Sequence, residues 1–337
     1  MRKSTHALTA TRAEVDTKTS SSSAEFHSRT VFTYDAARWP REKVRPEARG
    51  CVRVSYADAA QMEADFQQLA AELGATRSTL RVPQLDARRR MGILVSQFDH
   101  CLTELLHRWE GGELDVDLTC VIRRVAPGAG PGAPALNCGN PCFCFITRIC
   151  VSCVQRWAHT RSALRSNHQR ERNTYVSRFL ERHGVPLYYV PAGRVVPQGQ
   201  MRSHEPAMLS LVHRSDFLVL ARYMQVLSGA FLNAYGRDII NIHHGLLPSF
   251  KGANPYRQAY AAGVKVIGAT SHFVTEELDG GPIIEQMVER VSHRDSLSIF
   301  AEKSRTLEKN CLFTAARLYV DERVVRCEGG SRVAVLQ

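Results

Sequence analysis

The feature that most limits the fold is an alternation of strand-length apolar segments with amphipathic segments between Met91 and His244. The segments predicted to be strands are MGILVS, LDVDLTCVI, GVPLYYVP, DFLVLARYM and RDIINIHHG. The segments predicted to be helices are residues 99–108, 171–182, 205–213 and 227–235. Because strands that alternate with helices form parallel sheets with right-handed crossovers, the predicted fold class is α/β with a mostly parallel sheet.

The segments after this alternation differ from it. VKVIGATSHFV and PIIEQMVERV follow each other closely and are predicted to form a pair of strands. A helix is predicted over residues 297–319, because Leu307, Cys311 and Ala315 recur at helical spacing. Two short strands, at residues 323–325 and 333–336, are predicted to form a terminal hairpin.

The pattern of apolar residues in 30–85 predicts a separate small α+β domain, which precedes a larger domain at 90–337. The pattern gives a strand near Val31–Tyr34, a strand at Val52–Tyr56, a helix over Met62–Leu73 and a strand through Leu80 and Val82. No group of chemically reactive side chains accompanies these elements. A regulatory or oligomerisation role is therefore the expectation for this segment.

Residues 1–29 are polar and are predicted to be either a disordered tail or a weak mitochondrial transit peptide. They lack the apolar core of a secretion signal, and the chain contains no apolar run of transmembrane length. A mitochondrial or cytoplasmic location is expected, with mitochondria favoured. Membrane association is not expected.

The segment from residue 123 to 165 breaks the pattern of the larger domain. It begins Pro/Gly/Ala-rich and continues with five cysteines whose spacing offers only one C-x-x-C pair, so a zinc site is a minor alternative. If it is removed, Ile122 joins Ser166 and a strand–loop–helix–strand sequence results. We interpret residues 123–165 as an insertion foreign to the fold, with translation of an unspliced intron as the hypothesis for its origin.

The net charge of +11 invites a nucleic-acid-binding interpretation. Six of the arginines lie in residues 123–165, which contain no Asp, Glu or Lys. The remaining basic residues form no stripe along a predicted element. Nucleic-acid binding is therefore not expected.

Polar residues with catalytic chemistry gather between residues 240 and 281. Asn241 and His243 are two apart at the end of a predicted strand, so their side chains point to one face. An Asn amide can stabilise an oxyanion, and a His can transfer protons near neutral pH. Asp279, in a Gly-flanked loop, can orient the imidazole or polarise water. These three types suffice for attack of water on an acyl-like carbon.

Alternative interpretations of the same residues remain open. Asn241 and His243 can merely cap the strand, and Asp279 can merely stabilise a turn. His244 faces the other side of the strand and is expected to give structural support. A metal site formed by His243, His244 and His272 is disfavoured, because adjacent His side chains on a strand point apart.

Longer segments resemble a known family. NIHHGLLPSFKGANPYRQAY, GVKVIGATSHFV, LDGGPIIEQ and LARYMQVLS are similar to segments of the formyltetrahydrofolate deformylases (10-formyltetrahydrofolate hydrolases), within the wider formyltransferase fold family. The Asn-x-His pattern followed by D-x-G-x-I is shared with glycinamide ribonucleotide formyltransferases. The doubled His and the PYRQAY and GATSHFV blocks are typical of the deformylases. The resemblance spans about residues 91–337 outside the predicted insertion.

The resemblance implies a Rossmann-like, mostly parallel sheet, preceded by the latter part of an ACT domain at residues 30–85. It implies hydrolysis of 10-formyltetrahydrofolate to tetrahydrofolate and formate, in the one-carbon metabolism that feeds purine synthesis. No cofactor or metal is implied, the small-molecule partner is the folate substrate, and a homo-oligomer is expected. The implied catalytic residues are Asn241, His243 and Asp279. The implied substrate-binding residues are Met224, Val226, Leu227, Val274, Glu277, Asn167 and His168.

Three departures from the family pattern matter. The effector-binding first part of the ACT domain is missing, so regulation by an amino acid is not expected. Gly245 stands where the family usually has Ser, which is expected to loosen the site without removing the trio. The predicted insertion directly precedes Ser166, Asn167 and His168, which resemble an active-site-rim segment. A folate-binding protein without activity is therefore one alternative function.

The other alternative is formyl transfer to a phosphorylated amine. The transferase family holds that phosphate with a Gly-rich loop after the first strand, through exposed backbone N–H groups. Here MGILVS is followed by QFDHCLTELL, which contains no glycine. Water is therefore the expected acceptor of the formyl group.

Overall fold

The computed structural model describes residues 11–19, 26–33, 63–64, 66–68, 70–72, 79–80, 86–125, 174–191, 200–252, 254–292, 294–327 and 332–336. The chain divides into two units, Met1–Arg88 with Ala334–Gln337, and Arg89–Val333. Among the described helices, none is both long and apolar enough to cross a membrane.

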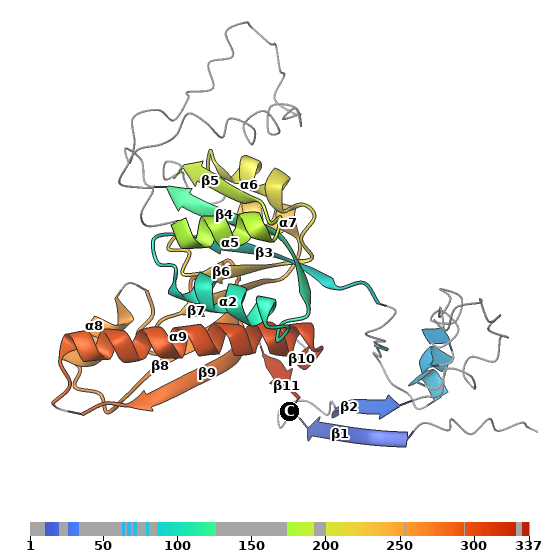
Figure 1. The fold of residues 1–337 in the computed structure, drawn as a ribbon. Coiled ribbons are helices and arrows are strands. Elements are labelled where there is room, and N and C mark those ends of the chain that lie inside the picture. The colour runs from blue at the N-terminus through green and yellow to red at the C-terminus, as the bar shows by residue number, and fades with distance from the viewer. Residues whose placement is uncertain are drawn as a thin grey trace, which may run out of the picture. The chain divides into compact units, whose positions relative to one another are not determined.

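Seven strands of the second unit form one mixed sheet in the order β5-β4-β3-β6-β7-β8-β9 (Figure 1). The strands from β5 to β7 run parallel, whereas β8 is antiparallel to both β7 and β9. This agrees with the predicted parallel core followed by a strand pair. The strands are β3 (Arg89–Val95), β4 (Val116–Val125), β5 (Leu187–Pro191), β6 (Phe217–Ala221), β7 (Ile239–His243), β8 (Val266–Phe273) and β9 (Ile283–Arg290).

Helices cover both faces of this sheet, because successive strand residues point to opposite sides and both sides are apolar. In β3, Ile93 and Val95 pack on one face, and Leu94 packs on the other. The first face is covered by α2 (His100–Glu110), α5 (Thr174–Arg182) and α9 (Leu297–Val320). The second is covered by α6 (Glu205–Val212) and α7 (Gly229–Tyr235).

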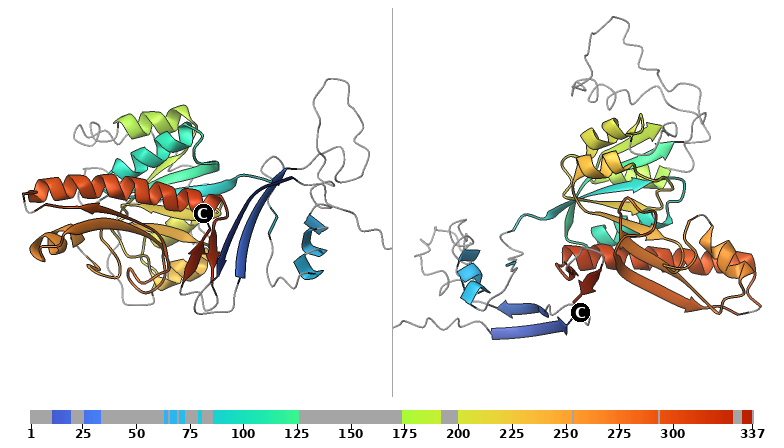
Figure 2. Two further views of the ribbon diagram at one scale, coloured as in Figure 1. Left: turned by 90° about the horizontal axis from the view of Figure 1, so that it is seen from below. Right: turned by 180° about the vertical axis from the view of Figure 1, so that it is seen from behind.

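Helix α9 is the longest of the described elements and lies along the sheet beside α2 (Figure 2). Ser296 caps it by accepting a hydrogen bond from the Ile299 N–H. The predicted apolar positions Leu307, Cys311 and Ala315 are buried. The buried face of α9 also carries two polar side chains, Ser304 and Glu308.

Strand β4 extends into the segment predicted to be an insertion. Strand β4 continues through Arg123, Arg124 and Val125, which pair with β5 up to Pro191. Arg123 is buried, and its guanidinium lies 2.6 Å from the Asp99 carboxylate. Strand length here is set by pairing with β3 and β5 rather than by the composition of the segment. Residues 126–165 lie outside the described ranges.

Among the described helices, one was not predicted from the sequence. Helix α8 spans Pro255–Ala261, with Pro at its first position and Asn254 before it in a left-handed conformation. It connects β7 to β8 and contacts α9.

In the first unit, β1 (Thr11–Thr19) and β2 (Phe26–Thr33) form an antiparallel hairpin. For these residues, the prediction of a tail without regular structure differs from the structure. Backbone hydrogen bonds between paired strands do not require apolar side chains, so composition did not reveal the hairpin. The described residues between 63 and 72 are helical, as predicted, whereas residues 79–80 have no regular structure. The strand predicted at Val52–Tyr56 lies outside the described residues.

The short strands β10 (Val324–Arg326) and β11 (Val333–Val335) pair with each other. This matches the terminal hairpin expected from the sequence.

Candidate functional site

The end of β7 carries Asn241 and His243 at the carboxyl edge of the parallel part of the sheet. Ligands of such sheets bind at this edge. Across the antiparallel junction with β8, Asn241 pairs with His272, and His243 pairs with Thr270. The junction therefore brings a second polar strand against the predicted catalytic strand.

Asp279 lies in the loop between β8 and β9 and reaches back to the end of β7. Its Oδ2 atom is 3.4 Å from His243 Nδ1, and both side chains are largely buried, with exposed fractions of 9% and 4%. The same oxygen accepts a hydrogen bond from the Gly252 N–H at 3.1 Å. The Asp279 backbone has φ of 52°, a left-handed conformation that aspartate tolerates better than most residues. The loop thus fixes the carboxylate against the imidazole.

The other ring nitrogen of His243 also faces an acceptor. Its Nε2 atom donates to the Phe250 carbonyl oxygen at 3.0 Å. The imidazole therefore lies between a carbonyl and a carboxylate, and both can stabilise a proton on the ring. This arrangement suits a group that takes a proton and returns it.

His272 lies between Asn241 and Asp279, the two members of the predicted trio other than His243. Its Nδ1–H donates to the Phe273 carbonyl at 2.9 Å, so Nε2 is left to accept from Asn241 Nδ2 at 3.2 Å. Burial lowers the pKa of His272, which keeps the ring neutral. Its Nε2 is also 3.8 Å from Asp279 Oδ1. An Asn amide carries two N–H donors, so one remains to stabilise an oxyanion.

This role of His272 was missed by the sequence analysis, which considered the residue only as a metal ligand. Both of its ring nitrogens are hydrogen-bonded to protein groups, which argues against a three-histidine metal site. The only sequence signal is indirect, namely the position of a His in the strand predicted to follow the catalytic one.

His244 points away from this group, as predicted. It is buried, and its ring lies 6.1 Å from that of Tyr256. Burial, with the nearby Arg222 charge second, lowers its pKa to about 3. The ring is therefore neutral at physiological pH and serves as a packing group.

Gly245 is closely surrounded. A Cβ atom at this position would lie 2.7 Å from the Pro255 Cβ and 3.1 Å from His243 Nε2. The space that a serine side chain would need is therefore occupied by the first residue of α8. The expectation that glycine loosens the site here is not supported, because Pro255 fills the gap.

The predicted pterin-binding segment follows β6 and contains both exposed and buried apolar residues. Met224 and Val226 are each 49% exposed, whereas Leu227 is buried among α6 and α7 residues. The Met224 N–H donates to Ser96 Oγ at 2.9 Å, which ties the segment to the end of β3. Exposed apolar side chains at the carboxyl edge are available to a flat apolar ligand.

The loop from Val274 to Asp279 is tied to β7 at its start and closed by a turn at its end. The Val274 N–H donates to the Ile239 carbonyl at 2.8 Å, and the Gly280 N–H donates to the Glu277 carbonyl at 3.2 Å. The Glu277 carboxylate is exposed and pairs with Lys251 at 3.1 Å. Asn167 and His168 lie outside the described residues.

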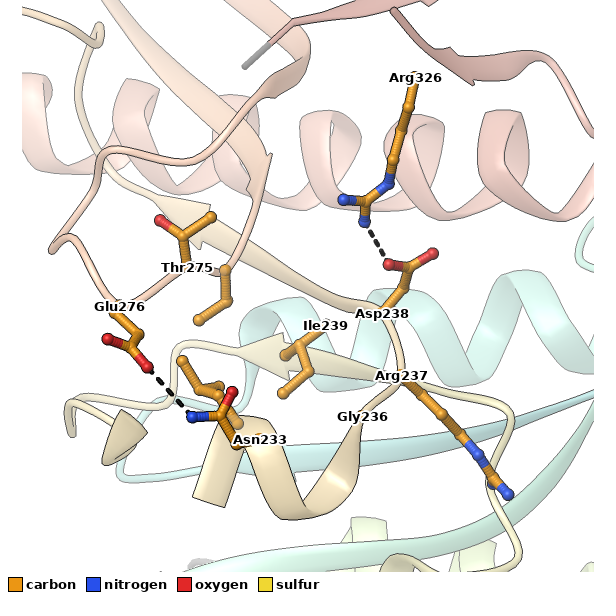
Figure 3. Close-up of a pocket in the computed structure, with 10 residues that line it drawn as sticks. Asn233, Gly236, Arg237, Asp238, Ile239, Thr275, Glu276 and Arg326 are labelled. Atoms are coloured by element: carbon orange, nitrogen blue, oxygen red, sulfur yellow. Dashed lines mark hydrogen bonds and ion pairs between the residues drawn. The ribbon is translucent and has the colours of Figure 1, made fainter. Parts of the chain in front are cut away.

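A cavity of about 270 Å³ lies at the opposite end of β7 (Figure 3). Asn233 and Glu276 are hydrogen-bonded on one side, and Arg326 pairs with Asp238 on the other. None of Asn241, His243 or Asp279 lines it. We place the candidate active site by its chemical groups rather than by cavity size.

Comparison with known proteins gives consistent results. The formyl transferase family profile matches residues 158–316, and the match begins inside the segment predicted to be an insertion. The chain is 46% identical over 300 residues to formyltetrahydrofolate deformylase 2, mitochondrial, of Arabidopsis thaliana, covering 89% of this chain and 71% of that protein. It is 34% identical over 264 residues to formyltetrahydrofolate deformylase of Bacillus subtilis, covering 78% and 70%.

Solved structures agree with the sequence relatives. A formyltetrahydrofolate deformylase from Pseudomonas syringae pv. tomato matches with a TM-score of 0.66 at 31% identity, over 98% of this chain and 86% of that chain. Glycinamide ribonucleotide transformylase 1 from Symbiobacterium toebii matches with a TM-score of 0.53 at 26% identity, over 74% and 95%.

Proposed function

Because the chain belongs to the formyltetrahydrofolate deformylase family, we propose that Asn241, His243 and Asp279 carry out the hydrolysis. The observation that carries this assignment is the Asp279 carboxylate 3.4 Å from His243 Nδ1, with Asn241 joined to the same group through His272. The three side chains offer a proton carrier, an anion and an N–H donor at one edge of the sheet.

The proposed reaction begins with addition of water to the formyl carbon of 10-formyltetrahydrofolate. The water proton passes to the His243–Asp279 pair, and the Asn241 N–H stabilises the negative charge that develops on the formyl oxygen. The carbon–nitrogen bond then breaks, the leaving nitrogen takes the proton, and formate departs. Asp279, held by the Gly252 N–H, stabilises the protonated imidazole between these steps.

We propose that the pterin lies against Met224 and Val226 and along the Val274–Asp279 loop. Both side chains are 49% exposed, so an apolar ring can reach them, and covering them would remove apolar surface from water. Leu227 is buried in the core and is proposed to support the segment from below. The carbonyl of Glu277 is already bonded within its loop, so its contribution is proposed to be the shape of the loop.

Water is favoured over an amine as formyl acceptor. The loop after β3 contains Asp99 as the residue preceding α2, with its carboxylate paired to Arg123. The residues between β3 and α2 contain no glycine that would expose backbone N–H groups to a phosphate, and the Asp99–Arg123 ion pair lies at the helix start. The likeness to a glycinamide ribonucleotide transformylase keeps transfer as the second candidate.

One assay separates the candidates. The purified full chain is incubated with 10-formyltetrahydrofolate, with and without glycinamide ribonucleotide, and formate is measured. Formate release without the amine is the expected result. Product formation only with the amine would favour the transferase, and folate binding without turnover would favour an inactive folate-binding protein.

We propose a mitochondrial location, which is supported by the names of two Arabidopsis relatives. A fluorescent fusion of the full chain tests it. We further propose that residues 30–85 are a partial ACT-like domain and that the enzyme is a homo-oligomer, for which light scattering of the purified chain is the test.

A further inference from the structure

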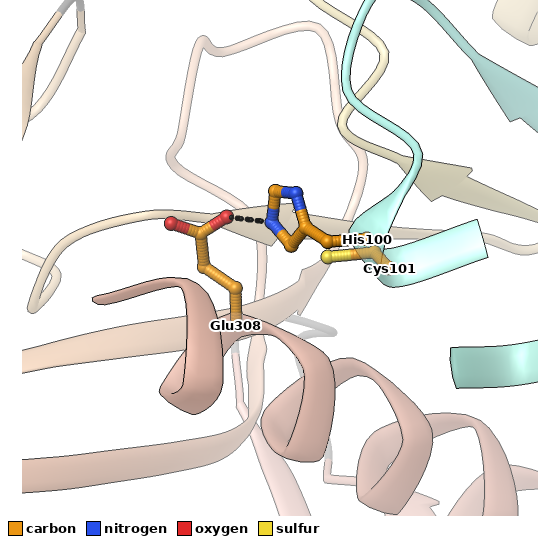
Figure 4. A group of neighbouring side chains, drawn as sticks. All are labelled: His100, Cys101 and Glu308. Carbon is orange, nitrogen blue, oxygen red and sulfur yellow. Dashed lines mark hydrogen bonds and ion pairs between the residues drawn. The ribbon is translucent and has the colours of Figure 1, made fainter. Parts of the chain in front are cut away.

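A buried polar cluster lies between α9 and the start of α2 and takes no part in the proposed chemistry. Glu308 of α9 is 2% exposed and reaches toward His100 and Cys101 at the start of α2 (Figure 4). Its Oε2 atom is 2.8 Å from His100 Nε2, and its Oε1 accepts from Ser304 Oγ at 3.0 Å. A buried carboxylate needs such partners, because an unpaired charge in the core is strongly unfavourable.

The cluster also contains a positively charged side chain, and this distinguishes an ion pair from a metal site. Arg222 Nε is 3.3 Å from the same Glu308 oxygen, and both side chains are more than nine-tenths buried. The ligand atoms of His100, Cys101 and Glu308 lie within 4.8 Å of one another, which is compatible with a metal ion. A guanidinium already neutralises the carboxylate, and burial raises the pKa of the Cys101 thiol well above its usual value. The cluster is therefore an internal ion pair rather than a cation site.

Arg222 stands at a conformationally demanding position. It is the first residue after β6, and its φ of 61° is in the left-handed region that non-glycine residues rarely adopt. Such a conformation persists only where the surroundings hold it. The Arg222 N–H donates to the Leu220 carbonyl at 3.1 Å. The Arg222 side chain is held by the Glu308 carboxylate and by the ring of Phe98, whose centroid is 5.2 Å from the guanidinium carbon.

The position of Arg222 in the chain connects this ion pair to the substrate. Two residues after it comes Met224, the exposed side chain proposed to contact the pterin. Met224 is held on its other side by the hydrogen bond from its N–H to Ser96. The turn at Arg222 thus sets the direction in which the Met224 segment leaves the sheet.

We propose that Glu308 is a positioning residue for substrate binding, which acts by holding Arg222 in its left-handed conformation and so fixing the Met224 segment. Glu308 itself does not contact substrate. This inference rests on the proposed contact between Met224 and the folate. Helix α9, which carries Glu308, would then contribute to substrate affinity without contacting the substrate.

The test compares Glu308→Gln with the matched control Glu302→Gln, an exposed glutamate on the same helix. Glu308→Gln keeps the shape of the side chain but removes the anion that faces Arg222. We expect KM for 10-formyltetrahydrofolate to rise at least about tenfold while kcat changes less than about threefold, because loss of ground-state positioning acts on binding. Glu302→Gln is expected to leave both values unchanged.

A double variant separates positioning from simple stability. In Arg222→Met with Glu308→Met, both charges are replaced by apolar groups, which usually restores the stability lost when one partner of a buried pair is removed. We expect the unfolding midpoint to return toward the wild-type value while KM remains raised. A wild-type KM in this variant, or in Glu308→Gln, would overturn the inference.

Three measurements distinguish a failure of this inference from a failure of the proposed function. If the wild-type chain releases no formate, the proposed function fails. If it is active and Met224→Ala leaves KM unchanged, the proposed folate contact fails. If Met224→Ala raises KM and the Glu308 variants do not, only the positioning role fails.

Discussion

Within the candidate site, His243 depends on Asp279, because the Asp279 carboxylate orients the imidazole ring and stabilises its positive charge. In Asp279→Asn the anion beside Nδ1 is lost, although the side-chain shape is kept. We expect Asp279→Asn and His243→Ala each to lower kcat at least about a hundredfold. Steady-state kinetics measure this, with Asp321→Asn at the end of α9 as a control. Near-normal turnover in either variant would refute the assigned roles.

His244 predicts a pH dependence of stability. In the folded chain its pKa is lowered to about 3, chiefly by burial and next by Arg222. In the unfolded chain the imidazole binds a proton near pH 6.5. The unfolded state therefore binds more protons at lower pH, and the free energy of unfolding falls. Between about pH 6.5 and 4.5 this residue alone should lower it by about 2 to 3 kcal/mol.

Denaturant unfolding at these two pH values checks the prediction. His244→Phe removes the titrating group and should lose less stability on acidification than the wild-type chain. His213→Gln, at an exposed position after α6, serves as the control. An equal pH-dependent loss in His244→Phe and wild type would contradict this account.

How far the sequence predicts single residues depends on whether the relation is local. Asn241 and His243 could be placed on one face because the strand repeat is two residues. The hydrogen bond from Asn241 to His272 could not, because it depends on the register between β7 and β8. The Gly-flanked loop led us to expect that Asp279 can orient the imidazole, but the backbone conformation that brings the carboxylate to His243 could not be predicted.

Among the elements, the segment after β6 offers a direct contrast between binding and packing. Met224 is exposed, so Met224→Ala should raise KM for the folate about tenfold with little change in stability. Leu227 is buried, so Leu227→Ala should lower the free energy of unfolding by about 2 to 5 kcal/mol. Kinetics and denaturant unfolding of both variants measure the contrast. A stability loss in Met224→Ala as large as that in Leu227→Ala would show that the segment is ordinary core.

Elements with a clear apolar period were predictable, and elements defined by their neighbours were not. The alternation of β3 to β7 with their helices follows from side-chain patterns. Helix α8 is only seven residues long and begins with Pro255, so its pattern is too short to identify. The end of β4 at Val125 follows from its pairing with β5, which the composition of residues 123–125 does not reveal.

At the scale of the whole molecule, the segment after β4 is the main question about activity. If residues 123–165 are foreign to the fold, a chain in which Ile122 is followed by Ser166 should be at least as active and as stable as the full chain. A second deletion, of residues 126–165, keeps Arg123 in β4 with its Asp99 ion pair. Measurements of kcat/KM and the unfolding midpoint on both chains test this. Loss of activity in both would show that the segment is a functional part of the enzyme.

The origin of the segment has its own test. Sequencing of the mature transcript distinguishes an unspliced intron from a coding exon. A mature message that encodes residues 123–165 would refute the intron hypothesis.

The long helix α9 also determines the stage of translation at which an active enzyme can fold. The ribosome makes Asn241, His243 and Asp279 before it makes Glu308, which faces the end of β6. A chain that terminates after β9 would carry the whole catalytic trio and leave the apolar face of β7, β8 and β9 uncovered. We expect such a fragment to aggregate and to release no formate, since uncovered apolar strands associate readily. Hydrolysis of 10-formyltetrahydrofolate would thus begin only in chains whose translation has passed α9, and prematurely terminated chains would not deplete the formyl donor.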